Sequence, residues 1–84
     1  MLSLKEVKDV IREHLEITLG IREFDITFAV MDEDLSGREV RKVWRINVEY
    51  PPEEGAIFKE RSLFKIDAES GDVLEFKKGW YWTY

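Results

Sequence analysis

The stretch VRKVWRINVEY, residues 40–50, decides the fold, because its apolar and polar residues alternate with a period of two. One face carries Trp44, Ile46, Val48 and Tyr50, and the opposite face carries Arg41, Arg45, Asn47 and Glu49. Such alternation is typical of a β-strand that is buried on one side only. Pro51-Pro52 ends the strand, since proline cannot donate a hydrogen bond to a sheet.

A second alternating run, EFDITFAVM at residues 23–31, lies upstream. Its apolar residues Phe24, Ile26, Phe28 and Val30 would share one face. Only residues 32–39, the centre of the acidic stretch MDEDLSGREV, separate this run from residues 40–50. The two runs therefore predict an antiparallel hairpin with an acidic connection.

Two further strands are predicted downstream, at residues 57–67 and 72–77. Phe64 and Ile66 would point inward from the first, and Leu74 and Phe76 from the second. Ser70-Gly71 between them is a tight-turn signal. Four strands in this order form a meander.

The N-terminal segment predicts one amphipathic helix over residues 3–18. Ser3 and Glu6 fit a capping box, and Gly20 is a natural stop. An apolar stripe follows the helical period at Leu4, Val7, Val10, Ile11, Leu15 and Thr18. We therefore expect a single domain over residues 1–84, of the α+β class, with one N-terminal helix packed on a four-stranded antiparallel sheet.

The amino-acid composition limits the classes of function that we expect. The 84 residues include one histidine and no cysteine, and no nucleophile or phosphate-loop motif is present, so we expect no enzyme. A net charge of −5 argues against a nucleic-acid partner, and no apolar run is long enough for a membrane. The 37% charged residues and the absence of glutamine predict a cytoplasmic protein of a thermophile.

The segments VWRINVEY and LFKIDAESGDVLEF resemble the PepSY pattern. The matching residues are Trp44-Arg45, then Asp67-Ala68-Glu69-Ser70-Gly71, then Val73-Leu74. The resemblance implies a small helix-plus-sheet fold of the cystatin-like kind. It also implies a non-enzymatic module that binds or restrains peptidases, usually outside the cytoplasm. From its amphipathic, charge-interrupted start we expect neither a signal peptide nor an anchor, which departs from the usual location of such modules.

The acidic connection also has the oxygen spacing of a calcium loop. Successive ligand positions of an EF-hand fall on Asp32, Asp34, Ser36 and the Arg38 carbonyl, with Gly37 at the glycine position. The closing glutamate is missing, since Val43 stands there.

A second acidic turn, with Asp67, Glu69 and Asp72, would lie at the same end of the meander. The two turns together predict a weak shared Ca²⁺ site. Equally, Asp, Ser and Gly are ordinary turn residues that keep sheet edges soluble. Both interpretations remain open at this point.

The C-terminal stretch GWYWTY, residues 79–84, is the other unusual feature. Trp80, Tyr81 and Trp82 could bind a protein partner, or could complete the core. His14 falls within the apolar stripe and is expected to be structural. The sequence thus predicts a small binding module that holds Ca²⁺ weakly through its acidic turns, or alternatively docks a partner through its sheet face or aromatic tail.

Overall fold

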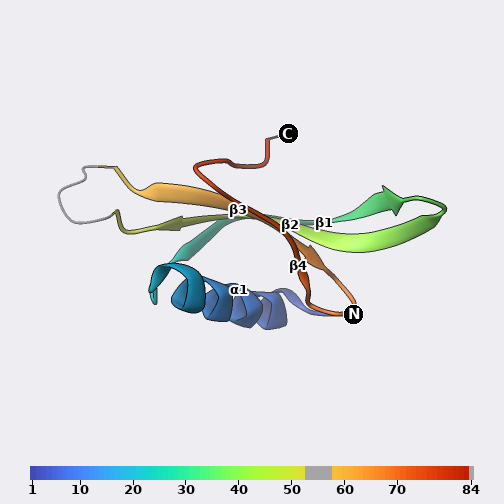
Figure 1. The fold of residues 1–84 in the computed structure, drawn as a ribbon, viewed down its shortest axis with the longest axis horizontal. Coiled ribbons are helices and arrows are strands. Elements are labelled where there is room, and N and C mark those ends of the chain that lie inside the picture. The colour runs from blue at the N-terminus through green and yellow to red at the C-terminus, as the bar shows by residue number, and fades with distance from the viewer. Residues whose placement is uncertain (53–57, 84) are drawn as a thin grey trace.

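The computed structural model describes residues 1–52 and 58–83, and within them one helix packs on a four-stranded antiparallel sheet (Figure 1). The elements are α1 (Leu4–Leu19), β1 (Asp25–Ser36), β2 (Glu39–Tyr50), β3 (Glu60–Asp67) and β4 (Val73–Lys78). The strands lie in the order β1-β2-β3-β4. This confirms the α+β class and the meander. The third strand begins three residues later than predicted, and the predicted start at residue 57 lies outside the described residues.

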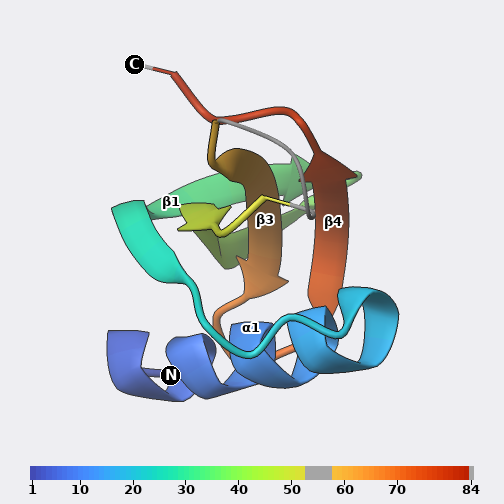
Figure 2. The same ribbon diagram turned by 90° about the vertical axis from the view of Figure 1, so that its left-hand side faces the viewer.

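The helix begins and ends where its capping residues predict. Ser3 Oγ accepts from the Glu6 amide at 3.2 Å, and Glu6 accepts in return from the Ser3 amide at 3.1 Å. Gly20 ends the helix with a φ of 68°, in the left-handed region that favours glycine. Figure 2 shows α1 running beneath the strands, from the β1 side of the sheet to the β4 side.

The core lies between α1 and one face of the sheet. The helix contributes Val7, Ile11 and Leu15, and the strands contribute Ile46, Val48, Tyr50, Phe64 and Ile66. All of these are essentially inaccessible to solvent. The predicted apolar face of β2 is therefore confirmed. Trp44 completes it at one end, where its indole N–H donates to the carbonyl of Leu2 at 3.1 Å.

The prediction that Phe28 and Val30 share the inward face of β1 with Phe24 and Ile26 is wrong. The pairing with β2 shifts register between Ile26 and Phe28, which is a β-bulge. One extra residue reverses the alternation, so Ala29 packs against the core while Phe28 and Val30 line a cavity on the opposite face. Both faces of β1 therefore carry apolar side chains.

A second irregularity corrects the prediction for β4. The register shifts beside Ile66, which pairs with Val73, whereas Phe64 pairs with Phe76. Val73 and Phe76 both pack against the core, and Leu74 is left exposed. The inward prediction thus holds for Phe76 and fails for Leu74.

The β1–β2 hairpin extends well past the rest of the sheet. The last ladder pair between β2 and β3 joins Val43 to Asp67, and the Lys42 carbonyl still accepts from the Ala68 amide at 3.0 Å. Beyond this point the backbones of residues 33–36 and 39–41 pair only with one another. We call residues 33–42 the arm; it is the long ribbon at the right of Figure 1. Residues 32–36 are therefore strand and not loop, and the turn is only Gly37-Arg38.

Candidate functional site

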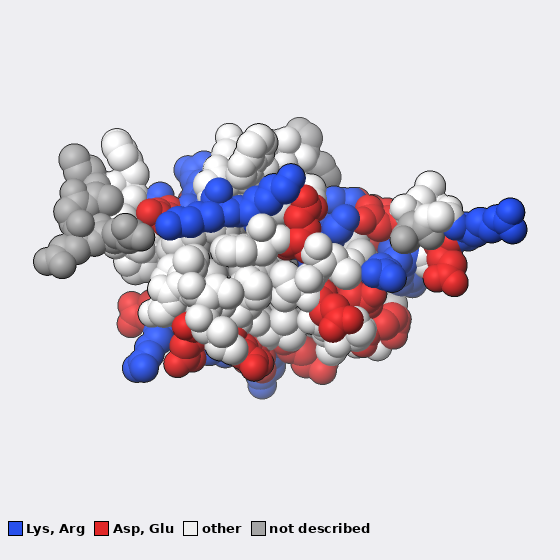
Figure 3. Space-filling view, viewed as in Figure 1, with Lys and Arg blue, Asp and Glu red and all other residues white. Residues whose placement is uncertain are grey.

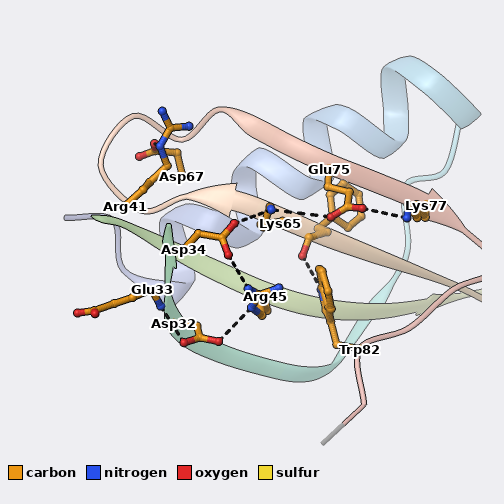
Figure 4. A network of polar contacts seen from close by, with 11 residues as sticks. Asp32, Glu33, Asp34, Arg41, Arg45, Lys65, Asp67, Glu75, Lys77 and Trp82 are labelled. Atoms are coloured by element: carbon orange, nitrogen blue, oxygen red, sulfur yellow. Dashed lines mark hydrogen bonds and ion pairs between the residues drawn. The ribbon is translucent and has the colours of Figure 1, made fainter. Parts of the chain in front are cut away.

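The carboxylates of the predicted calcium loop lie on the sheet face opposite α1, within a network of ion pairs centred on Arg45 (Figure 4). Asp32 contacts Arg45 Nε at 3.1 Å, and Asp34 contacts the Arg45 guanidinium at 2.8 Å. The other oxygen of Asp34 lies 2.6 Å from Lys65 Nζ. Lys65 in turn lies 4.0 Å from Glu75, which also pairs with Lys77.

Both oxygens of Asp32 and Asp34 are therefore occupied by N–H donors. The second oxygen of Asp32 accepts from the Glu33 amide at 2.8 Å. Lys65, through its hydrogen bond and charge, lowers the pKa of Asp34, and Arg45 adds to the effect. A cation at this position would have to displace two protein cations first.

Asp67 uses one oxygen within its own turn and the other on Arg41 of β2. One oxygen accepts from the amides of Glu69 and Ser70 at 2.8 and 3.0 Å, and the other lies 3.4 Å from Arg41 Nε. The backbone donors of Ser70 and Glu69 are the main reason that the pKa of Asp67 is lowered. This arrangement is a hydrogen-bonded turn cap.

The predicted calcium ligands do not gather at one point. Asp32 and Asp67 both pair with Val43, from opposite sides, so two strand spacings of about 10 Å in total separate their backbones. Glu69 and Asp72 are exposed in the β3–β4 turn, and Arg38 lies at the far tip of the arm. Ser36 is placed in β1, but its side chain is outside the description. Within residues 1–52 and 58–83, no group of three or more His, Asp or Glu side chains could hold a metal ion.

The hypothesis of calcium binding can be tested directly, and the ion pairs lead us to expect a negative result. Millimolar Ca²⁺ should leave the backbone amide NMR signals of residues 32–38 and 67–72 unchanged, because Arg45, Lys65 and Arg41 already neutralise the carboxylates. An R45Q/K65Q variant serves as the comparison, since it frees the oxygens of Asp32 and Asp34. Saturable shifts of both segments in the unmodified protein would restore the shared site.

The aromatic tail, residues 79–83, folds back over the outer face of the sheet and is fixed there by Trp82. The side-chain amide of Asn47 donates to the Trp82 carbonyl at 2.9 Å and accepts from the Trp82 amide at 2.6 Å. The indole N–H of Trp82 donates to the Phe64 carbonyl at 2.9 Å. The Arg45 guanidinium carbon lies 4.6 Å from the centre of the Trp82 ring.

Trp80 and Tyr81, immediately before this anchor, remain in solvent. Their exposed fractions are 64% and 50%. Lys77 Nζ lies 5.7 Å from the centre of the Trp80 ring, and the guanidinium carbon of Arg61 lies 5.4 Å from that of Tyr81. The three predicted partner-binding residues thus divide into one anchor and two exposed rings.

A cavity adjoins Tyr81 at this end of the molecule, with a volume of about 530 Å³. It is lined by Lys59, Glu60, Arg61, Lys78, Gly79 and Tyr81. Neither this cavity nor the part played by Asn47 was predicted from the sequence. The available signal for Asn47 was that it is the only asparagine, on the face of β2 that also carries Arg41, Arg45 and Glu49.

His14 has the structural setting that its place in the stripe predicts. Its ring meets those of Phe64 and Phe76 edge-on, with centres 5.3 and 4.8 Å apart. Burial lowers its pKa, because the charged form would lose its hydration. Its buried Nε2 has no hydrogen-bond partner within the described part of the chain.

Within the described ranges, no helix is both long and apolar enough to cross a membrane. Comparison of the chain with family models, with curated proteins and with solved structures gave no match. The resemblance to PepSY domains therefore rests on the segments quoted above, and the function has to be argued from the geometry of the fold and of its outer face.

Proposed function

We propose that this protein is a non-enzymatic binding module whose tail docks an acidic segment of a partner protein. The observation that carries the proposal is the contrast within the tail. Trp82 is fixed by hydrogen bonds to Asn47 and to the Phe64 carbonyl. The side chains of its neighbours Trp80 and Tyr81 are exposed to solvent on this anchored backbone.

Exposed aromatic rings on a fixed backbone are well suited to binding. Tryptophan and tyrosine supply much of the energy at protein interfaces, since they bury a large area with few rotatable bonds. The entropy of ordering the segment is already lost, because the contacts of Trp82 position it in the free protein. A partner would therefore meet Trp80 and Tyr81 close to their bound positions.

The charges around Tyr81 favour an acidic partner. The adjoining cavity is lined by three cationic side chains, Lys59, Arg61 and Lys78, and by one carboxylate, Glu60. Arg61 pairs with Glu49 and Lys78 with Glu60, both at 3.2 Å, but these pairs are on the surface, where an ion pair contributes only about 0–1 kcal/mol. Figure 3 shows Lys and Arg side chains beside uncharged groups along the upper side of the molecule, where the tail runs in Figure 1. Carboxylates of a bound segment could pair with these cations while its apolar side chains contact the rings.

Selection from a random peptide library tests the proposal. Peptides recovered on the immobilised protein should be enriched in Asp and Glu together with apolar residues. Their affinity for a W80A/Y81A variant should fall by at least tenfold, because each truncated interface aromatic typically costs about 1–2 kcal/mol or more. Fluorescence anisotropy of one labelled peptide measures the loss.

The matched control is the L35A/V40A variant, which removes two exposed apolar side chains from the arm instead. It should bind the selected peptide as the unmodified protein does. Peptides without acidic enrichment, or equal losses in both double variants, would exclude the tail as the docking surface. A peptidase partner, which the PepSY resemblance implies, would have to present such an acidic segment.

A further inference from the structure

A second cavity, of about 440 Å³, lies where the start of β1, the end of β2 and the segment before β3 meet the helix. It is lined by Lys8, Arg12, Arg22, Glu23, Phe24, Asp25, Tyr50, Pro51 and Lys59. The lining combines an apolar part, made by two aromatic rings and a proline, with several charged side chains. None of its cations belongs to the network around Arg45.

Cationic side chains reach this cavity from three separate parts of the chain. Lys8 and Arg12 stand one turn apart on α1, and each lies over the Phe24 ring, at 6.0 and 5.9 Å from its centre. Arg22 comes from the segment after the helix, and Lys59 from the segment before β3. The fold alone brings these four residues together, because they are up to 51 positions apart in the sequence.

The local charge opposes that of the whole molecule. Four cations line the cavity against two carboxylates, Glu23 and Asp25, in a chain of net charge −5. The ion pairs Lys59–Asp25 and Arg22–Glu16 are long, at 3.9 and 3.8 Å, and exposed, so they hold these cations weakly.

The two helical cations differ in their own ion pairs. Arg12 has a closer partner, Asp9, at 2.6 Å. Lys8 forms no ion pair with any residue in the ranges that the structure describes. The cavity therefore offers at least three cationic groups, those of Lys8, Arg22 and Lys59, to an incoming anion.

We propose that this cavity binds a phosphorylated small molecule. Arginine guanidinium groups match phosphate oxygens in a bidentate way, and lysines add point charges, so Arg12, Arg22, Lys8 and Lys59 supply the donors for more than one negative charge. The volume exceeds that of a single phosphate, which leaves room for an organic part against Phe24 and Pro51.

Titrations with pyrophosphate and with AMP at an ionic strength of about 0.1 M test this site. Calorimetry and amide NMR shifts at residues 8, 12, 22 and 59 should report saturable binding of at least one of them. A K8Q/R22Q variant should bind at least tenfold more weakly, since hydrogen bonds to charged groups contribute about 1.5–3 kcal/mol each. Both side chains are exposed, so the variant should fold normally.

The control variant R38Q/K42Q removes the same two charge types from the arm. It should change the affinity by less than about twofold, because Lys42 and the cavity residue Tyr50 lie eight residues, about 26 Å, apart along β2. This separation exceeds the Debye length of about 10 Å at 0.1 M salt. Tighter binding of AMP than of pyrophosphate would indicate that the adenine base contacts the apolar part of the cavity. Tighter binding of pyrophosphate would indicate that the site recognises phosphate groups alone. Absence of saturable binding of both at millimolar concentration, or equal weakening in the two variants, would overturn the proposal. The W80A/Y81A variant should bind these anions normally, so this result is independent of the tail.

Discussion

Replacing Phe64 by alanine should lower the free energy of unfolding by about 3–5 kcal/mol. Phe64 is fully buried in the middle of β3, between the rings of His14 and Phe76, at centre distances of 5.3 and 4.9 Å. The substitution removes apolar contacts to the helix and to β4 together, and leaves a cavity that a core this small cannot close. Such a loss is a large part of the about 5–15 kcal/mol that holds a domain together.

Urea unfolding followed by circular dichroism measures this change. Phe58→Ala is the matched control, because the same side chain is removed from a position that is 83% exposed. It should alter stability by no more than about 0.5 kcal/mol. Equal losses in the two variants would mean that the layer between helix and sheet is not the main source of stability.

Replacing Trp82 or Asn47 by alanine should each cost about 2–3 kcal/mol, and replacing both should cost little more than either. The two residues act as one unit, since Asn47 satisfies both the amide and the carbonyl of Trp82. Without Asn47 the tail loses the partners of its backbone. Trp82→Ala keeps those backbone groups but removes the indole bond to the Phe64 carbonyl and the contact with Arg45, so we expect the tail to detach and the Asn47 side chain to lose its partners. A double-mutant cycle by chemical unfolding gives the coupling.

Trp80→Ala provides the comparison for this pair, because Trp80 is the same residue type in the same tail but exposed. Its effect on stability should stay within about 0.5 kcal/mol. Additive losses for Asn47 and Trp82 would show that the tail is held by something other than their mutual hydrogen bonds.

The regular parts of the fold could be predicted because their determinants are local. The capping box at Ser3, the stop at Gly20 and the two-residue period of β2 each lie within a few residues of the structure that they cause. The two β-bulges could not be predicted. Apolar residues occupy both faces of β1 and β4, so the pattern does not show where Phe28 and Leu74 change sides.

The candidate site was predicted less well, because its determinants are distant in sequence. The spacing of Asp32 and Asp34 suits a cation loop, but their partners Arg45 and Lys65 arrive from β2 and β3. Only the strand register brings those cations beside the carboxylates. The tail stood out in the sequence by its aromatic residues, whereas the anchoring of Trp82 depends on Asn47, 35 positions earlier.

The arm gives β2 two unlike halves. From Val43 to Tyr50 the strand pairs with β1 on one side and β3 on the other, and the helix packs beneath it. From Glu39 to Lys42 it forms a ladder only with β1. The apolar side chains of the arm, Leu35 and Val40, are 82% and 58% exposed. Separating the ribbon's tip would uncover little apolar surface and would leave α1 in place. The hairpin end can therefore fray and re-form as its own small cooperative unit, while the rest of the same strand melts only with the whole domain.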